Sequence, residues 1–448
     1  MAQATSALLL AENLRPTSVV ENAVLYSTLG LLLFGPLAFG ATEPWSVLVL
    51  EIGAAFLLAV WCFAQFRHGT IEIASNPLFA PMASFGIIVV VLLATGQSAY
   101  RYETLSSFYL YAAFAVLCFL IVQLLRRSSQ IEVFARTLST YGCAIAVFAI
   151  VQGISSNGKL YWLRESRFGG WIYGPYVNHN HYAGLMELLV PIPLVVSLNE
   201  HAHSQTRKMA LAAASVMATS IFLSGSRGGM AAFAVQALIL GGLVLRKNRG
   251  QIRRSAMAIG IFVILLLGMM LWLGSSDVFE RITSINHEAR AELSGGTRVQ
   301  IDRDTIKMFS CRPLLGWGLG TFAEAYPQFR SFYSDFSVNA AHNDYLQLLA
   351  ETGILGFAVM LWFVFTMYRA ACAKLGRWST NTNAGVALAG MLSCTGILVH
   401  SALDFNLQVP ANAALFYALA VVAAMPPRFG IHRHRHEHRA EETARLSA

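Results

Sequence analysis

The sequence predicts an all-α polytopic membrane protein with about twelve transmembrane helices and a large, partly helical outer loop before the tenth. Hydrophobic residues make up 56% of its 448 residues and charged residues only 12%, a balance far from that of soluble globular domains. Apolar stretches close to the roughly 20 residues that cross a bilayer core recur along most of the chain. Lysine and arginine gather in alternate connecting segments, as expected for a protein with a defined orientation in the membrane.

Twelve apolar windows predict the spans in order. They lie near residues 22–40, 46–65, 78–96, 105–125, 133–153, 182–198, 208–224, 228–245, 255–274, 354–372, 384–403 and 411–425. The sixth, seventh, eighth and twelfth windows are short. One transmembrane domain over residues 22–425 follows, and outer loops at about 154–181 and 275–353 interrupt it.

The basic residues predict the orientation of the chain. Most of the 32 lysines and arginines face the cytoplasm if the N-terminus is placed there. We therefore expect residues 1–21 to be a polar cytoplasmic segment without a cleavable signal peptide. Residues 426–448 are expected to be a basic, disordered cytoplasmic tail, although its four alternating histidines could also bind metal. The net charge of +8 indicates contact with anionic lipid rather than with nucleic acid.

The larger outer loop has the pattern of a folded segment. Thr297 is placed to cap a helix that runs to about Ser310, and "CRPLLGWGLGTF" then predicts a tight turn. Thr321 is placed to cap a second helix, to about residue 333, whose aromatic residues recur at helical spacing. Pro327 would kink this helix. We expect it to lie along the membrane surface and to cover the site or guide a lipid.

One arginine stands alone between the seventh and eighth windows, in "LSGSRGGMAAF". The segment crosses twice only if it turns at "SGSRGG", which places Arg227 at the outer tip of a hairpin. There the guanidinium reaches headgroup depth or an aqueous cavity, whereas deep burial would cost about 3 kcal/mol or more. The serines and glycines leave backbone amides available to an anion. A snorkelling arginine on a tight hairpin explains the same residues without a function.

Further polar clusters fall on the same predicted face, and their convergence indicates a site there. They lie in "YGPYVNHNHYAG", "SGGTRVQIDRDT", "NAAHNDYLQ" and "HSALDFNLQVP", and comprise Asn178, His179, Asn180, His181, Arg298, Asp302, Arg303, Asp304, His342, Asn343, Asp344, Asp404, Asn406 and Gln408.

Each cluster also has an interpretation without a function. Asn343 or Asp344 can be no more than a helix cap. His179 and His181 lack a third metal ligand, so no metal is predicted. The two carboxylates of "DRD" point about 200° apart on a helix, which favours a solvated face. The acidic residues in or near the spans, namely Glu51, Glu187 and Asp404, are expected to pair with arginines, with proton relay as the functional alternative.

The ordered motifs "VNHNHYAG", "SGSRGG", "PLLGWGLGTF" and "HNDYLQLLAETGILG" resemble the O-antigen ligase family, over roughly residues 140–425. The resemblance implies a multi-pass protein of the bacterial inner membrane with a periplasmic site and cytoplasmic termini. It implies transfer of a glycan from an undecaprenyl diphosphate carrier to an acceptor hydroxyl, which in ligases belongs to the lipid A core. It also implies that neither a nucleotide nor a metal cofactor takes part.

Carried over residue by residue, the resemblance matches the family's hairpin arginine to Arg227, its loop arginine to Arg298 and its histidine to His342. The two arginines would bind the diphosphate, and His342 would act as general base. His181, Arg303 and Asn343 are further candidates for substrate binding. Asn178 and Asn180 are candidates as well, but His179 replaces the proline of the family's Asn-Pro-Asn form, so the match assigns them no role.

Three alternatives stay open at this stage. The family also contains O-antigen polymerases, which use the same kind of donor and differ in the acceptor. An anion or solute transporter would also need outward-facing arginine and buried carboxylates, although no inverted repeat is evident. A purely structural membrane protein would not need the outward set of Arg and His side chains. The expected partners are therefore a lipid-linked glycan, a glycan acceptor and membrane lipids.

Overall fold

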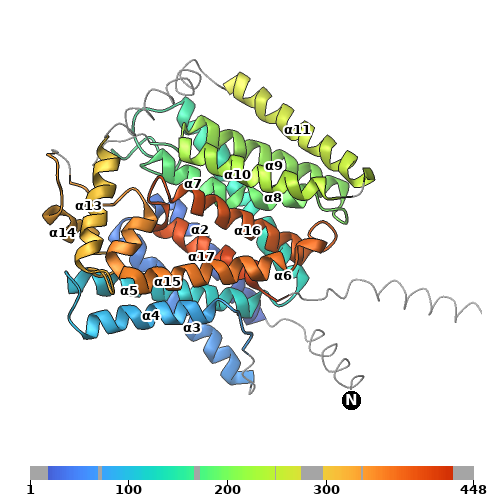
Figure 1. Ribbon diagram of the computed structural model, residues 1–448. Helices are drawn as coiled ribbons and strands as arrows, with labels where there is room; N and C mark the ends of the chain where they lie inside the picture. Colours follow the sequence, from blue (N-terminus) through green and yellow to red (C-terminus); the bar gives the residue numbers. More distant parts are fainter. Residues whose placement is uncertain are drawn as a thin grey trace, which may run out of the picture.

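The regular structure of the chain is helical wherever it is described, which confirms the predicted all-α class (Figure 1). The computed structural model describes residues 19–68, 73–165, 172–247, 249–273, 296–333 and 337–426. Within these ranges only two isolated β-bridges occur, both in the first outer loop. The predicted cytoplasmic tail lies outside the described residues from 427 onward, and so do residues 1–18 of the predicted N-terminal segment.

Every predicted window overlaps a helix. The helices are α2 (Val19–Leu37), α3 (Pro44–His68), α4 (Phe79–Ala94), α5 (Arg101–Leu124), α6 (Ser128–Ile154), α7 (His179–Leu189), α8 (Pro191–Ser197), α9 (Ser204–Leu223), α10 (Arg227–Leu245), α11 (Arg249–Leu273), α13 (Thr297–Cys311), α14 (Phe322–Ala325), α15 (Asp344–Cys372), α16 (Thr382–His400) and α17 (Pro410–Ala424). The sixth window falls on α7 and α8 together, because Pro191 has no backbone N–H with which to continue α7.

Among the described residues, eight helices are long and apolar enough to cross a membrane: α2, α3, α5, α6, α10, α11, α15 and α16. Two shorter apolar helices, α4 and α17, have 16 and 15 residues. The broken pair α7–α8 and helix α9 do not reach the same length and hydropathy. The chain is thus a polytopic helical membrane protein, and the count of twelve spans stays a prediction.

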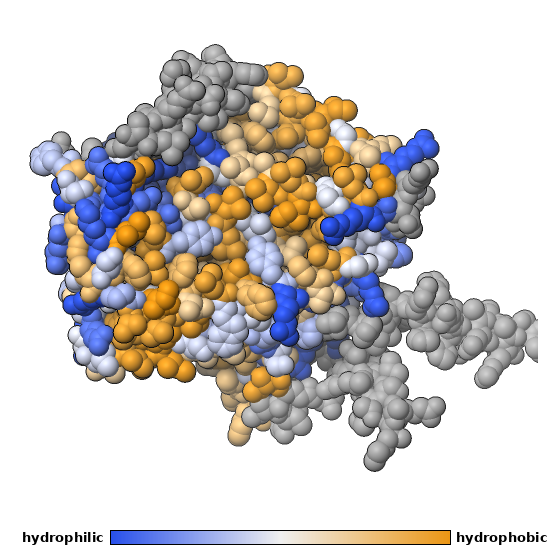
Figure 2. Space-filling model, viewed as in Figure 1, coloured by the Kyte–Doolittle hydropathy of each residue, from blue (hydrophilic) through white to orange (hydrophobic). Residues whose placement is uncertain are grey.

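The centre of the bundle is formed by α16 and α17, which lie between the α8–α9–α10 layer and the α4–α5–α15 layer (Figure 1). In the apolar part of α16, 78% of the residues are buried, against 17% in the corresponding part of α11. Figure 2 shows the surface of one face of the molecule, with hydrophobic residues across the middle and hydrophilic residues gathered toward both ends.

Several helix termini meet at one end of the bundle, here called the site end. Helices α7, α10, α15 and α17 begin there, and α9 and α16 end there, as the contacts between their termini establish. Helices α13 and α14 lie over this end, at the left in Figure 1. The residues of the polar clusters predicted from the sequence therefore gather at one end of the molecule.

The segment between α11 and α15, which the sequence predicts to be the larger outer loop and which keeps that name here, is attached to α15 by backbone pairing. Gly353 interrupts α15 with φ +64° and ψ −169°, a region open essentially to glycine alone. The interruption frees carbonyl groups at 350 and 351, which accept hydrogen bonds from the backbone of Trp317 (3.0 Å) and Gly318 (2.8 Å). The backbone of Ile354 in turn donates to the Pro313 carbonyl at 2.8 Å. The motifs "PLLGWGLGTF" and "AETGILG" are therefore two halves of one structural unit.

The buried carboxylate of Glu351 completes this unit. It accepts hydrogen bonds from the backbone N–H groups of Gly320 (2.8 Å) and Phe322 (3.2 Å), and from the Gln347 side chain (3.1 Å). These bonds satisfy amides at the start of α14 that have no partner within so short a helix. The position of the turn before α14 is thus determined by a side chain of a membrane helix.

Two predictions for the outer loop are wrong in detail. The cap of α13 is Gly296, so Thr297 is the first helical residue and not the cap. The predicted helix over 321–333 is only α14 and a 3₁₀ turn at Tyr326–Gln328, because Pro327 cannot continue it. Its aromatic residues do not form a membrane-surface face, since Phe322 and Tyr326 are buried against Ile301, Met308 and Ala350.

We expect Gly353→Ala to destabilise the outer loop. Alanine at this φ and ψ is strained, and its Cβ would clash with the Leu314 backbone, so a loss of about 2 kcal/mol or more is expected. Thermal unfolding in detergent, with limited proteolysis of the 313–322 segment, measures the effect. Gly268→Ala in α11 is the matched control, because its Cβ would meet nothing within 4 Å. Equal unfolding temperatures for the two variants would contradict the role given to Gly353.

Candidate active site

The centre of the site is a histidine against a buried carboxylate. Nδ1 of His342 lies 3.4 Å from Oδ1 of Asp404. The Asp404 side chain is 2% exposed, whereas that of His342 is 33% exposed. The imidazole therefore contacts the buried carboxylate and is itself accessible from the surface. His342 precedes α15 with φ +54°, which is unusual for a residue with a side chain. The next residue, Asn343, caps the helix by accepting from the backbone of Tyr345 and Leu346.

Asp404 is held as a carboxylate. Burial alone would raise its pKa, but the hydrogen bond with His342 and the nearby His181 and His400 outweigh burial and place its pKa below the usual range. Asn180 donates to its second oxygen at 2.6 Å. A carboxylate facing Nδ1 favours the His342 tautomer that carries the proton there, which leaves Nε2 as the proton acceptor.

An aromatic ring separates the two histidines of the site. Phe405 packs edge to face against His342, with ring centroids 4.9 Å apart, and against His181, at 4.7 Å. The His181 carbonyl accepts from the Asn412 side chain at 2.9 Å, which anchors α7 to α17. The loop between α16 and α17 thus holds the starts of α7 and α15 in a fixed relation.

Asp344 provides a second anchor for the same loop. Its carboxylate accepts hydrogen bonds from the Ser401 hydroxyl (2.7 Å) and from the backbone of Leu407 (3.0 Å). Its own backbone N–H donates to the Ser401 carbonyl at 2.9 Å. Since Asp404 lies between these contacts, its distance from His342 is determined by the attachment of the loop to α15.

Arg298 reaches the same cluster from α13. Its Nη1 donates to the Leu403 carbonyl at 3.1 Å, one residue before Asp404. Asp302 lies about one turn further along α13, where burial raises its pKa and the charges of His342 and Arg298 partly offset that rise. One face of α13 therefore contributes a cation and a carboxyl group beside His342.

Arg227 is the first residue of α10 at the site end, and the two glycines that follow it pack against a buried ion pair. His400 Nδ1 and Glu187 Oε1 are 2.8 Å apart, with side chains 1% and 0% exposed. A Cβ on Gly228 would clash with the His400 ring, and one on Gly229 would lie 2.7 Å from the Cβ of Ala183. The glycines of "SGSRGG" are thus explained by close packing, and the cap of α10 is Ser226, which accepts from Gly229 N–H at 3.1 Å.

The predicted site residues fall into four groups. His342, Arg298, Asn180 and His181 gather around Asp404 and Phe405. Asn178 and Asn343 are N-caps, of α7 and α15. For Asn343 this is the interpretation without a function given above. Arg303 lies on another face of α13 and lines a different hollow. Arg227 lies at the same end of the bundle as the first group.

The partners and the burial of the acidic residues differ from those expected from the sequence. Glu187 pairs with His400, and Asp404 contacts His342 and Asn180, so neither pairs with an arginine. The solvated face expected for "DRD" is wrong for Asp304, which is fully buried and accepts from the backbone and hydroxyl of Ser331. Sequence reasoning gave no role to His400 and Phe405, although both lie in the motif "HSALDFNLQVP". Their partners lie on or next to α7 and α15, too far away in the sequence for any motif spacing to indicate them.

A largely apolar cavity of about 400 Å³ reaches the site from inside the bundle. It lies between α4, α5, α15 and α17, and its lining includes the polar side chains of Asp344 and Gln408. Its apolar walls include Phe79, Met82, Val89, Phe114, Leu348, Met360 and Phe363. As for a metal, no group of three or more His, Cys, Asp or Glu side chains within the described ranges is arranged so that it could hold a metal ion.

The pair Glu187–His400 should behave as one unit. Replacement of either residue alone by leucine leaves its partner buried without compensation, which is expected to cost about 3 kcal/mol or more. The double replacement should cost clearly less than the sum of the two. Chemical denaturation of the three variants in mixed micelles measures the coupling. Additive losses would show that the two side chains contribute independently.

Comparison with known proteins covers part of this region. Residues 212–361 match the family model described as O-Antigen ligase, a segment that runs from α9 into α15 and includes Arg227, Arg298 and His342. A search of curated proteins found no match. Three of the four motifs that carried the resemblance lie inside the matched segment, and "VNHNHYAG" precedes it. The chain therefore contains a segment similar to the O-antigen ligase family, which confirms the resemblance over residues 212–361.

Proposed function

We propose that this protein transfers a glycan from an undecaprenyl diphosphate carrier to an acceptor hydroxyl, at the periplasmic face of a bacterial inner membrane. The family match supports a ligase or polymerase type of activity, and the apolar helices support a membrane location. The observation that carries the proposal is the His342–Asp404 pair, which places a half-exposed imidazole beside Arg298 at the site end.

His342 is the general base in this proposal. Its Nε2 takes the proton of the acceptor hydroxyl as that oxygen attacks the anomeric carbon of the donor. The bond from the anomeric carbon to the diphosphate oxygen breaks, and the electron pair leaves with the diphosphate. The negative charge of Asp404 stabilises the imidazolium that forms. Such base catalysis is typically worth about 100- to 10,000-fold in rate. A single displacement inverts the anomeric centre.

The arginines would stabilise the leaving diphosphate. Guanidinium groups bind phosphate oxygens in a planar, two-pronged geometry, and they bind more strongly as charge develops on the leaving group. Arg298 is exposed, and one of its nitrogens donates a hydrogen bond to the Leu403 carbonyl, so its other nitrogens are available to a ligand. Arg227 adds its charge at the N-terminus of α10, where the helix dipole also favours an anion.

The apolar cavity supports a lipid-linked substrate. Its lining includes Asp344, two residues after His342, together with aromatic and aliphatic residues of α4, α5 and α15. A substrate whose polar head reacts beside His342 can therefore place part of an apolar chain in this cavity. A soluble glycan donor has no apolar chain that could pack against the walls of this cavity.

The test is transfer in proteoliposomes that contain the purified protein and undecaprenyl diphosphate glycan, with and without lipid A core. Glycan on lipid A core identifies a ligase, and longer glycan on the carrier identifies a polymerase. His342→Ala should lose activity by about 100-fold or more. His203→Ala, an exposed histidine before α9, is the matched control. Full activity of His342→Ala would rule out its role as base, and a retained anomeric configuration would rule out single displacement.

Asp404→Asn tests the partner of His342. The amide keeps the size of the carboxylate but not its charge, so it neither stabilises the imidazolium nor favours the required tautomer. We expect turnover to fall by about 100-fold or more, with a smaller change in the KM for the donor. Steady-state kinetics in the same proteoliposomes provide the comparison. A raised KM with unchanged turnover would assign Asp404 to substrate binding instead.

A further inference from the structure

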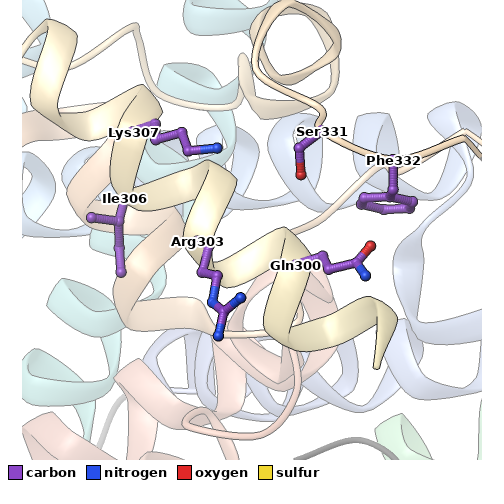
Figure 3. Close-up of a pocket in the computed structure, with 6 residues that line it drawn as sticks. All are labelled: Gln300, Arg303, Ile306, Lys307, Ser331 and Phe332. Atoms are coloured by element: carbon purple, nitrogen blue, oxygen red, sulfur yellow. The ribbon is translucent and has the colours of Figure 1, made fainter. Parts of the chain in front are cut away.

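A second polar hollow lies on α13, away from the candidate active site. It has a volume of about 570 Å³ and is open to the surface between α13 and the segment that follows α14 (Figure 3). Its lining residues are Gln300, Arg303, Ile306, Lys307, Ser331 and Phe332. Figure 3 shows Lys307 and Gln300 extending from α13 toward the segment that carries Ser331 and Phe332.

The helix itself separates this hollow from His342. At 100° per residue, Gln300, Arg303 and Lys307 lie within about 60° of one another, whereas Arg298 and Asp302 lie on the roughly opposite face. An α-helix with its side chains is about 10 Å thick. A glycan chain of a few sugar residues can therefore extend from the reaction site, past α13, to the hollow.

A buried carboxylate determines the shape of the hollow. Asp304 accepts hydrogen bonds from the backbone N–H of Ser331 (2.8 Å), from its hydroxyl (2.9 Å) and from Lys307 Nζ (3.1 Å). Burial opposes its ionisation, but these bonds outweigh burial and hold its pKa below the ordinary value. Ser331 and Lys307 are thus fixed before any ligand binds. The carbonyl of Phe332 is held in turn by Arg330 Nε at 3.0 Å.

The charge of the hollow is positive. The exposed Arg303 forms no ion pair or hydrogen bond within the described part of the chain. Lys307 contacts Asp304, yet its side chain is 62% exposed and retains donors for a ligand. The lining thus carries two cations, of which Lys307 contacts the buried carboxylate. The guanidinium of Arg303 is suited to a carboxylate or a phosphate.

The remaining lining residues suit a sugar ring. Phe332 offers an apolar ring face, Gln300 an amide with both donor and acceptor atoms, and Ser331 a hydroxyl at the rim. A neutral sugar would use these groups and leave both cations without a partner. An acidic sugar would use all of them.

We propose that this hollow binds an acidic sugar residue, one that carries a carboxylate or a phosphate, in the glycan chain that the protein handles. The identity of that chain rests on the proposed function, but binding of the sugar itself does not require transfer. The hollow then favours glycan chains with a negatively charged sugar residue a few sugars away from the glycosidic bond that forms.

Binding of trigalacturonic acid to the full-length protein in phosphatidylcholine nanodiscs is the test, measured by saturation-transfer NMR. Maltotriose, a neutral trisaccharide, serves for comparison. We expect binding of the acidic trisaccharide to be at least tenfold tighter than that of maltotriose, and to weaken between 50 and 300 mM NaCl, as order-of-magnitude expectations for a charged contact. Arg303→Gln should weaken it about tenfold or more, because one charge-assisted contact is lost.

Lys159→Gln is the matched control, since Lys159 forms a surface ion pair with Glu165 in the other outer loop. Arg303 lies on the surface, so its replacement is expected to leave the unfolding temperature unchanged. Equal affinity in Arg303→Gln and the parent protein, or no binding of the acidic trisaccharide, would overturn the proposal. Loss of binding in phosphatidylglycerol nanodiscs would overturn it in favour of a lipid headgroup. Retained binding in a protein that shows no glycan transfer would support the hollow while contradicting the proposed function.

Discussion

The arrangement of the site depends on one buried carboxylate, Asp404, in the loop between α16 and α17. It contacts His342 before α15 and Asn180 on α7, while the preceding carbonyl, of Leu403, accepts from Arg298 on α13. A charge this deeply buried is tolerable only where polar partners surround it, so its partners must stay in place. Three segments far apart in sequence are thereby brought to one point.

Close backbone packing lets those segments approach. Gly228 and Gly229 allow the start of α10 to lie against the Glu187–His400 pair, and Gly353 allows the outer loop to pair with the interrupted α15. In a membrane, where apolar surfaces gain little by leaving lipid for protein, small residues and hydrogen bonds provide much of this attachment. The loop that carries Arg298 is therefore joined by backbone hydrogen bonds to the membrane helix that His342 precedes.

The two faces of α13 divide the work that the proposed reaction requires. One face brings Arg298 toward the His342–Asp404 pair, where a diphosphate would be displaced. The other, held by Asp304, forms the hollow that suits an acidic sugar. In this proposal a short helix in the outer loop connects bond formation with the choice of glycan, since both sets of side chains belong to the same helix.

The sequence alone determined the membrane class, the positions of the apolar helices and the resemblance to the O-antigen ligase family over residues 212–361, because hydropathy and short motifs are local properties of the chain. It also indicated that His342 and Arg298 belong together. Only the tertiary structure decided which partner each buried charge has. Glu187 meets His400 across 213 positions, and Asp404 meets Asn180 across 224, distances over which no periodicity carries information. Likewise Pro327 shortened the expected aromatic helix, and burial of Phe322 and Tyr326 against α13 and α15 then followed from packing.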